Sequence, residues 1–135
     1  MANNNKVDVY NIQPNIFSRS TSPSEVGIKI PMDADESINW KRGQLIFRKD
    51  GTFSNTFSTD AELVGILVND IEYTATANME RQVDVYVAGW FMGSIIFDLQ
   101  NVATQNWLKA QATAKSLSSP YSQTLNNTII LEVGT

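Results

Sequence analysis

The 135-residue chain contains no cysteine and no histidine. Without cysteine it has no disulfide, no thiolate nucleophile and no cysteine-ligated zinc or iron–sulfur centre. Without histidine it lacks the side chain whose unperturbed pKa lies nearest neutrality, which is also the commonest metal ligand. These absences predict a protein without a metal or other cofactor. They leave a binding or structural protein, or an enzyme that uses carboxylates alone.

Charge is also scarce. Charged residues make up 18% of the chain, and 14 acidic against 10 basic side chains give a net charge of -4. Nucleic-acid affinity depends largely on Lys and Arg side chains that neutralise phosphates. We therefore expect no nucleic-acid partner, and we interpret the basic pairs Lys41–Arg42 and Arg48–Lys49 as ordinary surface residues.

Long hydrophobic runs are missing as well. The longest uncharged apolar run, residues 85–97, is bounded by Asp84 and Asp98. It is well short of the roughly 20 residues that a helix needs to cross a bilayer. The first residues are polar and no apolar segment typical of a secretory signal follows them. We expect synthesis in the cytoplasm and no membrane association.

From residue 26 onward the chain is dominated by short β-prone segments separated by turn residues. Asp50-Gly51 predicts a tight hairpin turn, because these residues tolerate the positive φ angles that such turns require. Residues 63–68 are almost continuously apolar, which predicts a strand buried on both faces. Residues 32–39 are interpreted as an acidic loop. The predicted strands are residues 26–30, 43–48, 52–57, 63–68, 71–76, 83–88, 94–97 and 128–133.

One helix is predicted, over residues 101–118. Asn101 is a suitable N-cap, and Ser118-Ser119-Pro120 ends the segment. Trp107 and Leu108 belong to a narrow apolar stripe, so Trp107 is expected to pack in the core. The fold class is therefore mainly β with one α-helix (α+β).

The N-terminal residues differ from the rest. Residues 1–25 are polar and contain Pro14 and Pro23, and between these features residues 7–12 alternate as an extended segment would. We predict an N-terminal arm over residues 1–25 and a β-rich domain over residues 26–135. Such an arm is suited to adding a strand to a partner's sheet edge. The alternatives are a disordered tail or an edge strand of its own domain.

Residues 89–93 place three bulky side chains, those of Trp90, Phe91 and Met92, between two glycines. Side chains alternate along a strand, so these three cannot all face one core. We expect at least one of them at the surface or at a subunit contact. Glycines at such a place indicate a bulge, a bend or a close approach of two backbones.

The acidic residues Asp33, Asp35 and Glu36 have a spacing that suits calcium. The EF-hand loop, however, needs Gly at its sixth position and Glu at its twelfth, and these are Ile38 and Gln44 here. We interpret the cluster as a solvated loop.

Asp84 and Asp98 flank the aromatic segment, and two carboxylates beside aromatic rings are ingredients of a glycosidase site. Asp84 alternates with valines, which predicts that it points to solvent. We therefore predict no catalytic residues and no enzymatic activity.

The order of the segments resembles a known family. Residues 42–47 (RGQLIF), 61–67 (AELVGIL) and 83–89 (VDVYVAG) are followed by the predicted helix and the last strand. In this order they resemble the lambda-type head decoration proteins of tailed bacteriophages. The resemblance covers roughly residues 40–133, and the N-terminal arm matches in character.

The resemblance implies a small β-barrel or β-tulip-like domain preceded by the arm. It implies a homotrimer on the outer surface of an expanded icosahedral head, at three-fold and quasi-three-fold sites. There the protein would bind the major capsid protein and stabilise the virion against internal DNA pressure. On this basis, the capsid-binding arm residues are Val7, Val9, Tyr10 and Ile12, and the trimer contact is Trp90, Phe91 and Met92.

Two other functions fit the same sequence. One is a carbohydrate- or receptor-binding β module, which predicts exposed aromatic side chains along a groove. The other is a different head or tail structural protein of a phage, which would assemble into rings or tubes.

Overall fold

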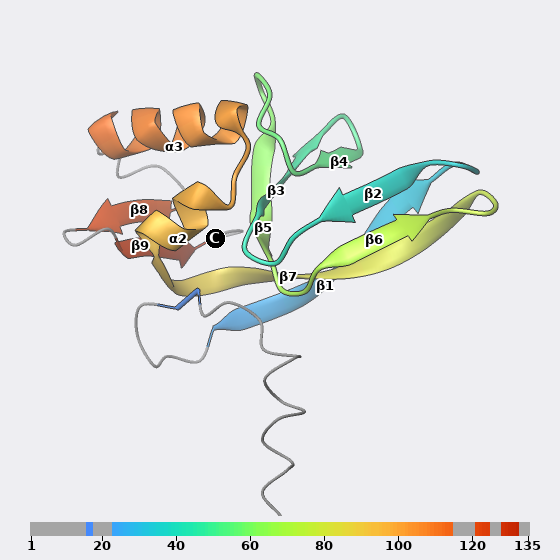
Figure 1. Cartoon of the computed structure of the whole chain (residues 1–135), viewed down its shortest axis with the longest axis horizontal. Coiled ribbons are helices and arrows are strands. Elements are labelled where there is room, and N and C mark those ends of the chain that lie inside the picture. The colour runs from blue at the N-terminus through green and yellow to red at the C-terminus, as the bar shows by residue number, and fades with distance from the viewer. Residues whose placement is uncertain (1–15, 18–22, 115–120, 125–127, 133–135) are drawn as a thin grey trace, which may run out of the picture.

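The computed structural model describes residues 16–17, 23–114, 121–124 and 128–132 (Figure 1). Within them the chain is mainly β, with a curled half-barrel sheet and two short helices. The elements are β1 (Ser24–Met32), β2 (Ser37–Trp40), β3 (Leu45–Lys49), β4 (Thr52–Ser54), β5 (Glu62–Leu67), β6 (Ile71–Thr74), β7 (Met79–Met92), α2 (Gly93–Asp98), α3 (Val102–Ala114), β8 (Tyr121–Thr124) and β9 (Thr128–Glu132).

Strand β7 is the centre of the sheet. It pairs with the whole of β1 over residues 79–88, with β5 at residues 85–86, and with β9 over residues 88–92, always antiparallel. In the described chain the main sheet has seven strands, in the order β4-β3-β5-β7-β9-β8 with β1 also on β7. Strands β2 and β6 form a separate two-stranded sheet.

Both faces of the central strands are covered. Successive residues of β5 and β7 point to opposite sides, so Ile66 and Tyr86 join one core cluster and Leu67 and Val85 join the other. The first cluster packs beneath α2 and α3, and the second beneath β2 and β6 (Figure 1). This confirms the prediction that residues 63–68 are buried on both faces, with Val64 half-buried.

The predicted hairpin turn is confirmed. Lys49 pairs with Thr52, so Asp50 and Gly51 form a two-residue loop between β3 and β4. Their φ angles are 52° and 79°. Positive φ at both positions is typical of the turn whose twist matches that of the flanking strands.

Two predictions of secondary structure were wrong. Residues 94–97 form most of helix α2 instead of a strand, because the helix buries Ile96 completely against the core. The predicted loop 32–39 shrinks to four residues, since β1 continues to Met32 and β2 begins at Ser37. The alternation of buried Ile38 and Trp40 with exposed neighbours is the signal that the sequence reading missed.

Helix α3 starts where the sequence predicts. The backbone N–H of Thr104 donates to Asn101 Oδ1 at 3.1 Å, so Asn101 is the N-cap. Trp107 packs on the core as predicted, with its ring stacked on Phe57 (centroids 5.2 Å apart) and edge-on to Phe47. The helix is described to Ala114, and the predicted end at residue 118 lies outside the described residues.

The helices are fastened to β3 by a buried amide. Gln100 is 6% exposed, and its Nε2 donates to Gly43 O at 2.9 Å and to Ile96 O at 2.7 Å. Its Oε1 accepts the backbone N–H of Leu45 at 2.9 Å. A buried polar side chain is tolerated when its donors and acceptors are paired in this way.

The folded domain includes residues that the sequence reading assigned to the arm. Ile16 is completely buried in the first core cluster, and Phe17 packs beside it. Strand β1 starts at Ser24, two residues before the predicted domain boundary. The structured domain therefore extends further toward the N-terminus than residue 26.

Two glycines in the sheet allow a matched test of packing. A Cβ at Gly65 would lie 2.5 Å from the backbone oxygen of Tyr86 and 2.9 Å from Val85 Cβ, both in the neighbouring strand. A Cβ at Gly27 would meet chiefly the end of the Gln82 side chain, which can move. We expect Gly65→Ala to lower the free energy of unfolding by about 1–3 kcal/mol. Gly27→Ala is expected to change it by less than about 0.5 kcal/mol.

Urea denaturation followed by tryptophan fluorescence measures both variants. Equal destabilisation by the two substitutions would contradict the close approach of β5 and β7.

Candidate binding site

The arm residues assigned to capsid binding, Val7, Val9, Tyr10 and Ile12, lie outside the described residues. The structure does describe the point at which that segment joins the domain. Ile16 O accepts the backbone N–H of Met92 at 2.8 Å, and Phe17 forms a bridge with Phe91. Ile16 and Phe17 are thus held beside the C-terminal end of β7.

Phe17 is held by aromatic and cationic neighbours. Its ring lies 5.2 Å from that of Tyr86 in an edge-to-face arrangement and 5.3 Å from that of Phe91. The Arg42 guanidinium lies over both the Phe17 and Tyr86 rings, at 5.8 and 5.9 Å. Such contacts stabilise beyond simple area burial, so they fix the anchor of the N-terminal segment.

Arg42 is a structural residue, contrary to the sequence interpretation. Its side chain is half-buried, and Nη1 donates to Val68 O at 2.6 Å and to Tyr86 Oη at 3.2 Å. The neighbouring Lys41 is exposed, as expected for a surface residue. Arg48 forms an exposed ion pair with Glu62 across β3 and β5.

Trp90, Phe91 and Met92 of β7 point to alternate faces of the strand, as expected for β structure. Phe91 is fully buried between Phe17 and Tyr86, so it has no surface to offer a second subunit. Trp90 and Met92 are half-buried on the other face of the strand. The predicted trimer contact is therefore reduced to Trp90 and Met92, which stay a prediction.

Gly89 explains how this segment fits. Its φ is +148°, and a Cβ there would lie 3.2 Å from both the Phe91 ring and Pro23 Cβ. The atoms that crowd Gly89 belong to side chains, so the contact here is with the Phe91 ring and with Pro23, the residue that precedes β1, and not a close approach of two backbones. This contact brings the start of β1 against the C-terminal half of β7.

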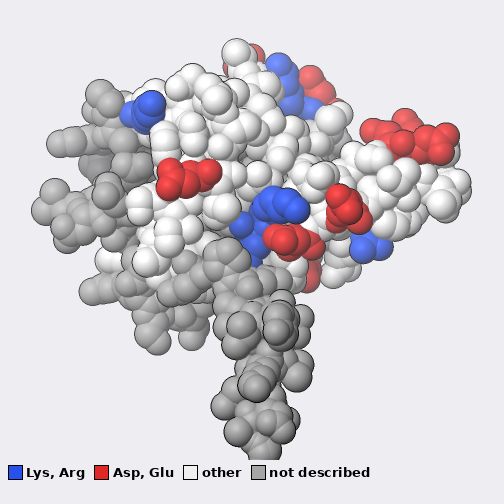
Figure 2. Space-filling model, in the orientation of Figure 1, with Lys and Arg blue, Asp and Glu red and all other residues white. Residues whose placement is uncertain are grey.

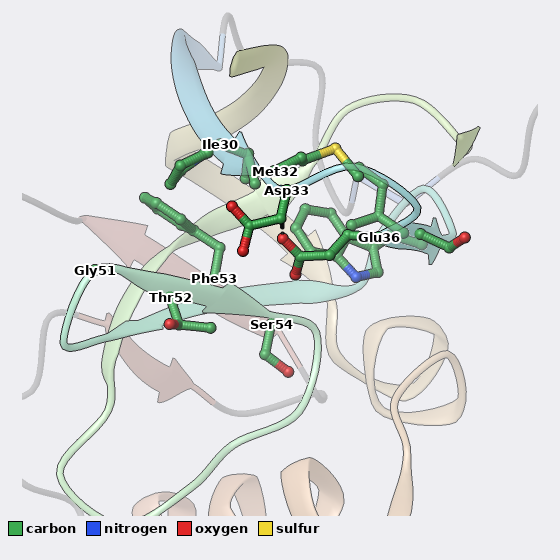
Figure 3. Close-up of a pocket in the computed structure, with 12 residues that line it drawn as sticks. Ile30, Met32, Asp33, Glu36, Gly51, Thr52, Phe53 and Ser54 are labelled. Atoms are coloured by element: carbon green, nitrogen blue, oxygen red, sulfur yellow. Dashed lines mark hydrogen bonds between the residues drawn. The ribbon is translucent and has the colours of Figure 1, made fainter. Parts of the chain in front are cut away.

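A pocket of about 420 Å³ lies where the curled sheet fails to close, between β1 and β4. Ile30 and Met32 of β1 and Phe53 of β4 contribute apolar walls, with Ile38 and Trp40 of β2. Asp33 and Glu36 stand on one side, and Phe53 faces them from the other (Figure 3).

The turn between β1 and β2 holds the two acidic residues, Asp33 and Glu36, in position. Glu36 Oε1 accepts the backbone N–H of Asp33, and the Ala34 N–H donates to Asn78 Oδ1 at 2.8 Å. Asp35 adopts φ 73° and its N–H donates to Ala75 O, which ties the turn to the end of β6. An acidic patch covers this tip of the molecule (Figure 2).

In the described chain, no three acidic side chains are grouped as a metal site would require. Asp84 is exposed in the middle of β7, as predicted, and Asp98 is exposed at the end of α2. No helix among the described residues is long and apolar enough to span a membrane.

Comparison of the chain with protein-family models, curated proteins and solved structures found no match. Sequence reading missed Ile16, Phe17, Arg42 and the pocket. The first two carried a signal, since adjacent apolar residues within a polar stretch favour burial. The pocket carried none, because it exists only where strands distant in sequence meet.

Arg42 and Lys41 form a natural pair for a test. Arg42→Gln removes a guanidinium that makes two hydrogen bonds and covers two rings. We expect it to lower the free energy of unfolding by about 1–3 kcal/mol. Lys41→Gln removes the same charge from an exposed position and is expected to be neutral within about 0.5 kcal/mol. Denaturant titration distinguishes the two, and equal effects would show that Arg42 has no structural role.

Proposed function

We propose that this chain is a decoration protein of a tailed-bacteriophage head. It binds the outer surface of the expanded icosahedral shell at three-fold and quasi-three-fold sites, contacts the major capsid protein, and resides in the virion. It is not an enzyme and uses no cofactor. The β-rich α+β class of the structure supports the proposal, and the β-tulip-like barrel is part of what we propose.

One observation supports the proposal above the others. Buried Ile16 and half-buried Phe17 anchor the N-terminal segment beside Trp90 and Met92. The arm expected to bind the capsid and the residues expected to join subunits are thereby rooted at the same end of the domain. A trimer formed through that end would gather three arms at its centre, facing a three-fold position of a shell.

Binding of this kind stabilises the shell by mass action. A protein that binds the assembled, expanded lattice and not its separated subunits shifts the equilibrium toward the lattice. Trimerisation makes the attachment multivalent, so individually weak arm contacts combine into tight binding. No chemistry beyond recognition is required.

The carbohydrate-binding alternative is less well supported. It predicts exposed aromatic faces along a groove, because sugars stack on open rings. Trp40, which lines the pocket, is 5% exposed, and Phe53 is half-buried.

A pair of truncations tests the arm separately from the core. Deleting residues 1–12 removes the β-prone segment and keeps Ile16 and Phe17. We expect this protein to keep its free energy of unfolding and to lose binding to expanded heads that lack the protein, viewed by electron microscopy. Deleting residues 1–17 also empties the Ile16 site and is expected to cost about 3 kcal/mol or more. Heads decorated normally by the shorter truncation would rule out the arm as the capsid contact.

The trimer contact has its own test. Trp90→Ser combined with Met92→Ser removes two half-buried apolar side chains from one face of β7. Light scattering measures the mass of the protein, either extracted from decorated heads or isolated at high concentration. We expect this mass to fall from that of a trimer to that of a monomer. Val102→Ser is the control, because Val102 is an apolar residue that is 70% exposed and belongs to α3 instead of β7. An unchanged trimer in the double variant would remove these residues from the interface.

A further inference from the structure

The pocket between β1 and β4 has a chemistry that the proposed capsid role does not use. We propose that it is a docking site for a lysine or arginine side chain, presented by an extended segment of a partner protein. The inference concerns the pocket alone and does not depend on the capsid assignment.

The shape of the pocket follows from the open sheet. Strand β1 pairs with β7 and β4 pairs with β3, and within the described residues neither has a strand on its outer edge. Because the sheet curls, these two edges approach one another, and the space of about 420 Å³ lies between them. A closed barrel would have a pair of strands there.

A half-buried aromatic ring offers a surface for an aliphatic stem. Phe53 supplies it, whereas Ile30, Met32, Ile38 and Trp40, which also line the pocket, are each at most 9% exposed. Long basic side chains bury their methylene groups along apolar surface while the charged head stays near water. Asp33 and Glu36 line the same pocket and are exposed to solvent (Figure 3).

The carboxylates are available for a cation. Glu36 Oε1 accepts one backbone N–H, and in the described chain neither Asp33 nor Glu36 forms an ion pair. Two of the arginines are engaged elsewhere: Arg81 lies over the Tyr73 ring at 4.3 Å, and Arg48 pairs with Glu62. Charge-assisted hydrogen bonds from an ammonium or guanidinium group to these oxygens are stronger than neutral ones.

The free strand edges favour a segment of protein over a small molecule. An extended peptide can lie along an unpaired strand and place alternate side chains into a pocket. Pro31 of β1 has no N–H, which interrupts the edge and limits continuous strand pairing there. Recognition would then depend on the inserted side chain more than on the backbone.

The test uses the full-length chain and three synthetic peptides. Each is a short, β-prone sequence of alternating valine and threonine whose central residue is lysine, norleucine or glutamate. Fluorescence anisotropy of labelled peptides gives the affinities. We expect the lysine peptide to bind most tightly, norleucine more weakly because it keeps the stem without the charge, and glutamate least.

Three variants locate the interaction. Asp33→Asn with Glu36→Gln removes both charges and keeps the side-chain shapes, and should weaken the lysine peptide about three- to tenfold. Asp60→Asn with Asp98→Asn removes the same net charge from exposed sites that do not line the pocket, and should leave the affinity unchanged. Asp33→Lys with Glu36→Lys should reverse the preference toward the glutamate peptide.

Chemical-shift changes on adding the lysine peptide should be concentrated at Ile30, Met32, Thr52 and Phe53. Equal binding of the three peptides, no binding of any, or equal loss in the pocket and control variants would overturn the proposal. Binding of oligosaccharides at these residues, with no peptide binding, would assign the pocket to a sugar instead. Failure of the capsid test leaves these results unaffected, because no capsid protein is present.

Discussion

The backbone of β7 is the constraint on which the rest of the structure depends. A strand of fourteen residues has backbone donors and acceptors along its whole length, and buried ones must be paired. Here β1 pairs with residues 79–88, β5 with residues 85–86 and β9 with residues 88–92. With these partners arranged on β7, the sheet bends into a curled half-barrel.

The bend determines where core and surface lie. Alternate side chains of β5 and β7 belong to two hydrophobic clusters. One cluster is covered by the helices and the other by β2 and β6. The helix side is fixed by the paired amide of Gln100, which links α2 to the start of β3. On the other side, β1 and β4 approach without pairing, and a pocket stays open between them.

The two candidate surfaces therefore have different origins. The anchor of the N-terminal segment is a core feature, since Ile16 is fully buried and Phe17 packs against three aromatic or cationic neighbours. The pocket lies where β1 and β4 approach without pairing, and two exposed carboxylates are among the residues that line it. The anchor lies by the C-terminal end of β7 and the pocket by its N-terminal half, where β1 ends, so a partner at one need not exclude a partner at the other.

The sequence by itself determined the features that depend on neighbouring residues: the β-rich class, the Asp50-Gly51 turn, the Asn101 cap and the two-sided burial of residues 63–68. The sequence also excluded a single core for the side chains of Trp90, Phe91 and Met92, because side chains alternate along any strand. Tertiary structure decided which of them is buried, made a helix of residues 94–97, and drew Ile16 and Arg42 into structural roles. The physical reason is that burial and pocket shape arise from contacts between strands far apart in sequence, which local patterns do not encode.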